Sequence, residues 1–124
     1  MIKGIGVDMV AIDTVREMMA RSDSFVKHTF TEREIKLSEQ AVSKEEFFSG
    51  RFAVKEAVFK ALAHLTRQKT FDFRMVETLK HEDGSPFVNT DGKLSEIMRD
   101  AGVERLLVSI STEKEYAIAF VTAE

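Results

Sequence analysis

The sequence predicts an α+β fold in which a mostly antiparallel sheet packs against a long buried helix and shorter helices. The chain has 124 residues, so we expect a single domain over residues 1–124. A segment near its middle is apolar around most of a helical wheel, which is typical of a buried helix. The predicted order is a strand, then helices, then strands with one helix among them, and this order is typical of α+β architecture.

The first predicted element is a strand over residues 2–10, because apolar residues alternate there with glycine and aspartate. One face would carry Ile5, Val7 and Met9, and the other Gly4, Gly6 and Asp8. The glycine face would leave room beside Asp8. Asp8 is therefore a candidate site residue, although a carboxylate at a strand end more often caps the following turn.

Helices are predicted next, with a short one over residues 12–21. The sequence TERE at 31–34 is typical of a capping box, in which the Thr31 hydroxyl caps a helix and Glu34 reaches back to it. SKEE at 43–46 repeats the signature with Ser43 and Glu46. It opens the long helix, which we expect over about 44–65.

The second half of the chain predicts strands around one helix. FRMVETLK at 73–80 is interpreted as a strand, HEDGSP as a turn and FVN as a second strand. KLSEIMRDAG is expected to form a short helix, with Leu94, Ile97, Met98 and Ala101 on one face and Gly102 ending it. RLLVSIS and YAIAFVTA flank TEKE, which predicts a hairpin with a four-residue connection.

Composition excludes several classes of protein. The net charge is −3, so no global basic field favours nucleic acid. The chain has no cysteine, which excludes disulfides, thiolate metal sites and a cysteine nucleophile. No apolar run reaches the roughly 20 residues of a membrane span, and MIKGIGVD lacks the apolar region of a secretory signal. We therefore expect a soluble cytoplasmic protein that binds neither membrane nor nucleic acid.

Four charges within residues 50–62 of the long helix, GRFAVKEAVFKAL, need an explanation, because an unpaired buried charge is costly. Glu56 and Lys60 share one narrow polar strip and have the favourable orientation for an i,i+4 ion pair, worth about 0.2–0.5 kcal/mol. Arg51 and Lys55 have like charge, so they need carboxylates from elsewhere or an anionic ligand. Structural partners and a solvated Glu56–Lys60 pair are the simpler alternatives. The functional alternative is that Asp8 and Glu56 hold a magnesium ion next to phosphate-binding cations.

The chain also resembles a known family. The segments GIGVD, FTERE, FFSGRFAVKEAVFKAL and SIS…KEYAIAFV occur in the order and spacing found in the holo-(acyl-carrier-protein) synthases, the small trimeric type of 4′-phosphopantetheinyl transferase. Such enzymes move the phosphopantetheine arm of coenzyme A to a serine of an apo acyl carrier protein and release adenosine 3′,5′-bisphosphate. The resemblance covers essentially the whole chain. It implies an α+β homotrimer with active sites at chain interfaces, and Mg²⁺ as cofactor.

The resemblance also implies roles for individual residues. Asp8 and Glu56 match the magnesium ligands, and Lys60 matches the lysine near the pyrophosphate. Glu56 and Lys60 are thus the expected catalytic residues, although the base that takes the serine proton is either Glu56 or a metal-bound water. The expected coenzyme-binding residues are Arg51, Lys60, Ser109, Ser111 and Thr112. An acidic carrier protein would dock near Arg16 and Arg21.

Three departures from the family pattern affect these expectations. Ala63-His64-Leu65 stands where a Gly-Thr-Gly-like loop is usual, Thr112-Glu113 stands where a histidine is usual, and Thr14 replaces an arginine on the first helix. The coenzyme pocket is therefore expected to be weaker than is typical. A catalytically impaired paralogue or a trimeric scaffold is the alternative to an active transferase, but neither needs Asp8, Glu56 and Lys60 together.

Overall fold

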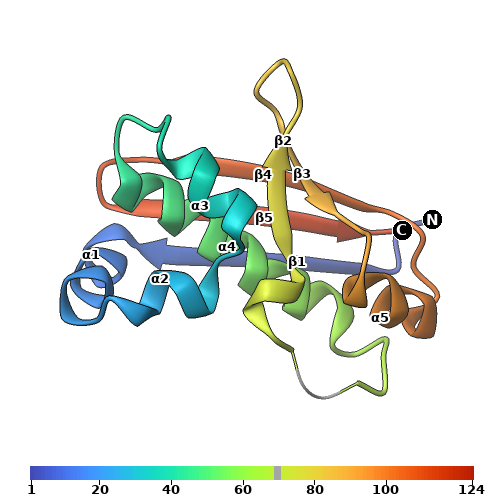
Figure 1. Cartoon of the computed structure of the whole chain (residues 1–124). Coiled ribbons are helices and arrows are strands. Elements are labelled where there is room, and N and C mark those ends of the chain that lie inside the picture. The colour runs from blue at the N-terminus through green and yellow to red at the C-terminus, as the bar shows by residue number, and fades with distance from the viewer. Residues whose placement is uncertain (69–70) are drawn as a thin grey trace.

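The computed structural model describes residues 1–68 and 71–124 of the chain (Figure 1). Its elements in chain order are β1 (Gly4–Ala11), α1 (Ile12–Arg21), α2 (Ser24–Thr29), α3 (Glu32–Ser38), α4 (Lys44–Leu62), the 3₁₀ helix η1 (Phe73–Met75), β2 (Glu77–Lys80), β3 (Pro86–Asn89), α5 (Lys93–Ala101), β4 (Leu106–Thr112) and β5 (Tyr116–Ala123). None of the helices in these described ranges is long and apolar enough to cross a membrane.

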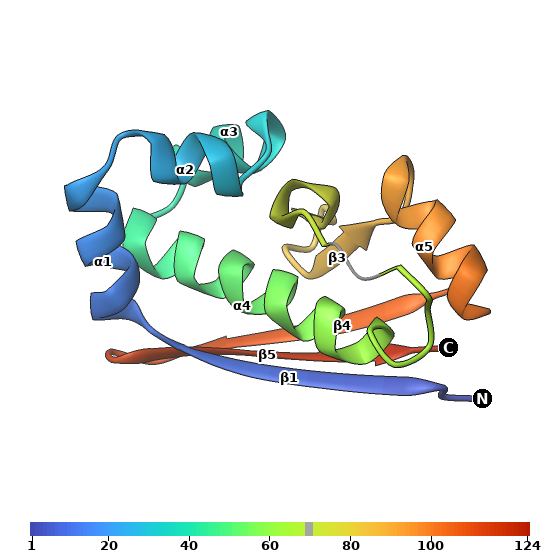
Figure 2. The same cartoon turned by 90° about the horizontal axis from the view of Figure 1, so that it is seen from below.

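The strands form two antiparallel sheets, which confirms the predicted α+β class. The larger sheet has the order β1-β5-β4, so β1 and β4 are its two edges, and the smaller one pairs β2 with β3. Figure 2 shows α4 lying along one face of the larger sheet, with α2, α3 and the β2–β3 pair beyond α4. The hydrophobic core lies around α4, whose Ala53, Val54, Ala57, Val58 and Ala61 are fully buried.

Two glycines let α4 approach the sheet closely. A Cβ atom added to Gly4 would overlap the carbonyl oxygen of Ala61, and one added to Gly6 would overlap that of Ala57. The predicted alternation of β1 is therefore confirmed, and the space on its glycine face is filled by the α4 backbone.

The opposite face of the larger sheet is apolar and exposed, and we call it the outer sheet face. Its exposed large residues are Ile5, Val7 and Met9 on β1, Leu107 on β4, and Tyr116, Ile118 and Phe120 on β5. The register places Val7 opposite Phe120 and Met9 opposite Ile118, so these side chains form one continuous surface. Contiguous apolar patches of this kind usually mark an interaction site.

Several details of the sequence prediction differ from the structure. Residues 73–75 form η1 rather than a strand, because the Asp72 carboxylate accepts a hydrogen bond from Arg74 N and closes a turn there. The helix α2 was not predicted. The helix α4 ends at Leu62 rather than near residue 65, and three residues rather than four connect β4 to β5.

Candidate active site

The side chains of Asp8 and Lys60 meet where β1 crosses the second half of α4. Lys60 Nζ donates hydrogen bonds to Asp8 Oδ1 and to the carbonyl oxygen of Val7, both at 3.1 Å. The Asp8 side chain is 18% exposed and that of Lys60 is 56% exposed. The glycine face of β1 thus brings a carboxylate and an ammonium group to a position that solvent and a ligand can reach.

Glu56 lies one helical turn before Lys60 and belongs to the same group. Burial raises the pKa of its carboxyl, the negative charge of Asp8 raises it further, and Lys60 partly opposes both effects. The predicted i,i+4 ion pair between Glu56 and Lys60 does not form in the described residues, because Lys60 pairs with Asp8 instead. Two carboxylates therefore repel each other beside a single lysine.

This pair of carboxylates fits a magnesium ion. Magnesium prefers hard oxygen ligands and usually takes one or two carboxylates together with waters and substrate phosphates. The described parts of the chain hold no group of three or more His, Cys, Asp or Glu residues that could bind a metal ion. In these parts, protein side chains alone do not complete the coordination of a metal ion. The raised pKa of Glu56 also fits, since a bound cation would relieve its repulsion with Asp8.

Arg51 and Thr112, both expected to bind the coenzyme, meet in a second place, which we call the Arg51 cleft. This cleft has a volume of about 210 Å³ and is lined by Ala41, Val42, Ser43, Glu46, Phe47, Gly50, Arg51, Ile110 and Thr112. The Arg51 guanidinium lies over the Phe47 ring, 4.2 Å from its centroid. Burial lowers the pKa of Arg51, and Arg51 Nε is buried without a hydrogen-bond partner. An unpartnered cationic donor of this kind is suited to an anionic ligand.

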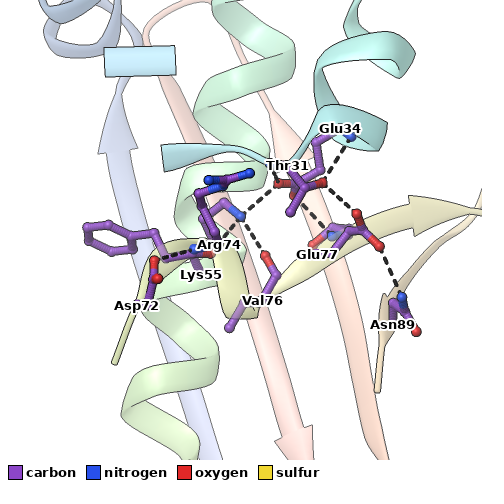
Figure 3. A network of polar contacts seen from close by, with 10 residues as sticks. Thr31, Glu34, Lys55, Asp72, Arg74, Val76, Glu77 and Asn89 are labelled. Carbon is purple, nitrogen blue, oxygen red and sulfur yellow. Dashed lines mark hydrogen bonds and ion pairs between the residues drawn. The ribbon is translucent and has the colours of Figure 1, made fainter. Parts of the chain in front are cut away.

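Lys55 has a structural partner, so of the two alternatives for its charge the carboxylate is found and the anionic ligand is not needed. Its buried Nζ lies 2.8 Å from Glu34 Oε1 and donates hydrogen bonds to the carbonyl oxygens of Phe73 and Val76 (Figure 3). Glu34 is the carboxylate that the charge of Lys55 required. One chain therefore satisfies this charge without help from a neighbour.

Ser109 and Ser111 are not brought to the Arg51 cleft. They stand opposite Phe120 and Ile118 in the β4–β5 register, so their side chains lie on the outer sheet face. Thr112 comes next on β4 and faces the other way, into the cleft. The three predicted residues of this strand are therefore divided between two surfaces.

The two basic residues expected to contact a carrier protein lie on α1. Arg16 is half exposed and pairs with Asp13, and Arg21 is exposed in the last turn of the helix. Sequence reasoning missed Phe47 as the ring under Arg51. The i,i+4 spacing of Phe47 and Arg51 on the predicted helix could have indicated this contact, because residues four apart lie next to each other on a helix surface.

Comparison with known proteins decides the family. The sequence model of the 4′-phosphopantetheinyl transferase superfamily matches residues 4–121. The chain belongs to this superfamily. Superfamily members called holo-[acyl-carrier-protein] synthase from Clostridium novyi and Clostridium acetobutylicum are 39% and 36% identical to it. Both matches span the whole chain and cover 88% and 98% of the respective relatives.

Solved superfamily structures agree with this fold. The holo-[acyl-carrier-protein] synthase of Neisseria meningitidis matches with a TM-score of 0.89 at 29% identity, over 100% of this chain and 99% of that one. The enzyme of Helicobacter pylori, solved in complex with coenzyme A, matches with a TM-score of 0.82 at 28% identity, over 97% and 99%. The 4′-phosphopantetheinyl transferase fold expected from the sequence is thus confirmed.

Proposed function

We propose that this protein transfers the 4′-phosphopantetheine group from coenzyme A to a serine of an apo acyl carrier protein and releases adenosine 3′,5′-bisphosphate. The observation that carries the proposal is the meeting of Asp8, Glu56 and Lys60 at one partly exposed position. The names of its full-length relatives support the same reaction, and coenzyme A is bound in a related structure.

The residues of the site suit the chemistry of phosphoryl transfer. The serine oxygen forms a bond to the β-phosphorus, and the bond from that phosphorus to the bridging oxygen breaks. A magnesium ion held by Asp8 and Glu56 would neutralise the charge that develops on the phosphate oxygens. Lys60, once a phosphate competes with Asp8 for its ammonium group, donates hydrogen bonds to the same oxygens. The serine proton passes to Glu56 or to a water at the site.

We also propose that the protein is a homotrimer with active sites at chain interfaces. Asp8 lies on one edge strand of the larger sheet and Thr112 on the other. Along α4, Arg51 and Lys60 are nine residues apart, or about 14 Å, which separates the Arg51 cleft from the carboxylates of the same chain. A ring of chains, each joined by unlike surfaces to the next, would bring one chain's cleft to its neighbour's carboxylates.

The acceptor is proposed to be an acidic apo acyl carrier protein that docks on α1 near Arg16 and Arg21. Their exposure and positive charge support this. Arg16 is partly neutralised by Asp13, so Arg21 is expected to contribute more. The cytoplasm, where coenzyme A and carrier proteins are used together, is the proposed location.

Intact-mass measurement tests the transfer directly. An apo acyl carrier protein incubated with coenzyme A, Mg²⁺ and this protein should gain the mass of one phosphopantetheinyl group. A carrier whose acceptor serine is changed to alanine is the control and should gain nothing. An unchanged apo carrier would favour the impaired paralogue or the scaffold instead.

A further inference from the structure

The Arg51 cleft has an unusual balance of charge for a site that receives an anion. Its lining holds one cation, Arg51, and one carboxylate, Glu46. The other lining residues are neutral, Thr112 among them. Glu34 also acts on the Arg51 guanidinium electrostatically. From its own chain, an anion in this cleft therefore meets one guanidinium whose charge is partly offset.

The chemistry of coenzyme A indicates which anion this is, if the proposed function holds. Coenzyme A carries two anionic groups, the pyrophosphate and the 3′-phosphate. The pyrophosphate contains the reacting phosphorus, so it belongs with Asp8, Glu56 and Lys60. Among the described residues, the only cationic side-chain nitrogen that is buried without a partner is Arg51 Nε. This unpaired donor is the observation that favours the Arg51 cleft as the site of the 3′-phosphate.

A phosphate monoester carries a charge of about −1.5 to −2 at neutral pH. A guanidinium binds a phosphate monoester well when the two groups are free to form two parallel hydrogen bonds. Here the guanidinium is already held against Phe47, and Glu46 is a like charge for the incoming phosphate. The attraction of Arg51 and the repulsion of Glu46 therefore oppose each other at the same group.

We propose that the Arg51 cleft discriminates weakly for the 3′-phosphate, that Glu46 determines this specificity, and that dephospho-coenzyme A is a second phosphopantetheine donor. The 3′-phosphate takes no part in the bonds that change. With dephospho-coenzyme A, the serine oxygen forms the same bond to the β-phosphorus and the same phosphorus–oxygen bond breaks. The leaving group is then adenosine 5′-monophosphate, which departs with the electron pair of that bond.

The test compares kcat/KM for the two donors with the full-length protein, Mg²⁺ and an apo carrier protein. We expect the value for coenzyme A to exceed that for dephospho-coenzyme A by less than about tenfold, since a partly offset charge pair contributes little. Glu46→Gln should raise kcat/KM for coenzyme A by about two- to fivefold and change the value for dephospho-coenzyme A much less.

Glu45→Gln is the matched control, because Glu45 is also an acidic residue of the first turn of α4 but does not line the cleft. Glu45→Gln should alter the ratio of kcat/KM for coenzyme A to kcat/KM for dephospho-coenzyme A much less than Glu46→Gln does. A preference for coenzyme A above about tenfold in the unmodified protein, or equal effects of Glu46→Gln on both donors, overturns the proposal.

Failure of the transferase assignment is recognised separately, because then neither donor modifies the carrier. In that case calorimetry with the same protein gives the dissociation constants of coenzyme A and dephospho-coenzyme A, and these replace kcat/KM in the comparison. Values for coenzyme A and dephospho-coenzyme A within about tenfold of each other uphold weak discrimination, and a larger difference refutes it.

Discussion

Asp8 and Glu56 reach the candidate site from a strand and a helix, and each is tested by replacement with its amide. If both hold magnesium, Glu56→Gln and Asp8→Asn keep the shape of the side chain but remove an anionic ligand. We expect transfer to fall by orders of magnitude and the magnesium concentration for half-maximal rate to rise. The measurement is the magnesium dependence of transfer, with circular dichroism as the control for folding.

If Asp8 and Glu56 are only solvated surface partners of Lys60 and hold no metal, the two variants should behave differently. Activity would stay near normal and only the local charge would change, because the hydrogen bond between Lys60 and Asp8 is partly exposed. Near-normal turnover at ordinary magnesium in either folded variant would remove that residue from the site.

The raised pKa of Glu56 makes a second prediction about the same residue. A carboxyl whose folded pKa lies above its unfolded value binds more protons in the native state, so its contribution to stability falls as pH rises through that window. Burial and the charge of Asp8 cause the shift. Without magnesium, Glu56→Gln should therefore melt slightly higher than the unmodified protein at pH 7. The difference should vanish as pH falls below the unfolded pKa. A lower melting temperature at pH 7 would contradict this.

At the scale of elements, Glu34 shows what could and could not be predicted from the sequence. The capping box of α3 was predicted from TERE, and both of its hydrogen bonds are present between Thr31 and Glu34. Local spacing determines such a motif, so the sequence is sufficient. The same carboxylate also accepts hydrogen bonds from Lys55 on α4 and from Thr78 N on β2. These partners are 21 and 44 residues away, and no local pattern indicates them.

This double use of Glu34 leads to a prediction about stability. Glu34→Gln should leave the buried Lys55 ammonium without its counter-ion and cost about 3–5 kcal/mol of unfolding free energy. Glu32→Gln, an exposed first-turn position of the same helix, is the control and should change stability by less than about 1 kcal/mol. Urea denaturation measures both. Equal losses of unfolding free energy in the two variants would show that the buried Lys55–Glu34 pair contributes no more to stability than an exposed carboxylate at the start of α3.

The Arg51 cleft, formed where α4 faces β4, supports a prediction about coenzyme affinity. Thr112 lines it without charge, and Glu113 follows in the connection to β5. Changing Thr112 to His and Glu113 to Thr adds a donor and removes a carboxylate, so the KM for coenzyme A should fall. Steady-state kinetics with varied coenzyme A measures the effect. An unchanged or higher KM would mean that other groups already compensate for these two residues.

At the scale of the whole molecule, alternation along β1 predicted two faces but not their environments. The apolar Ile5, Val7 and Met9 would be expected to face the core, yet they are exposed, and Gly4 and Gly6 are buried. The reason is that α4 needs a surface without side chains to approach the strand closely. The apolar face of β1 then remains uncovered by the described part of the chain. A sequence pattern interpreted for a single isolated domain does not predict such an exposed apolar face.

The exposed apolar residues of the outer sheet face are the physical reason to expect chains to associate. Sedimentation equilibrium should give the mass of three chains at micromolar concentration. Phe120→Asp, which places a charge at the centre of the face, should shift the protein toward monomer. A monomeric unmodified protein under these conditions would end the trimer proposal and the shared-site argument with it.

Mixing two variants, each impaired in a different group of the site, tests whether the site is shared between chains. Asp8→Asn removes a carboxylate but keeps Arg51, and Arg51→Ala removes the cleft cation but keeps Asp8. In a ring of mixed chains, an intact Asp8 from one chain meets an intact Arg51 from its neighbour at some interfaces, so co-expressed variants should regain transfer at limiting coenzyme A. Each variant alone has no such interface and stays impaired. If both groups of a working site came from one chain, no mixture could restore activity, because every chain would lack one of them.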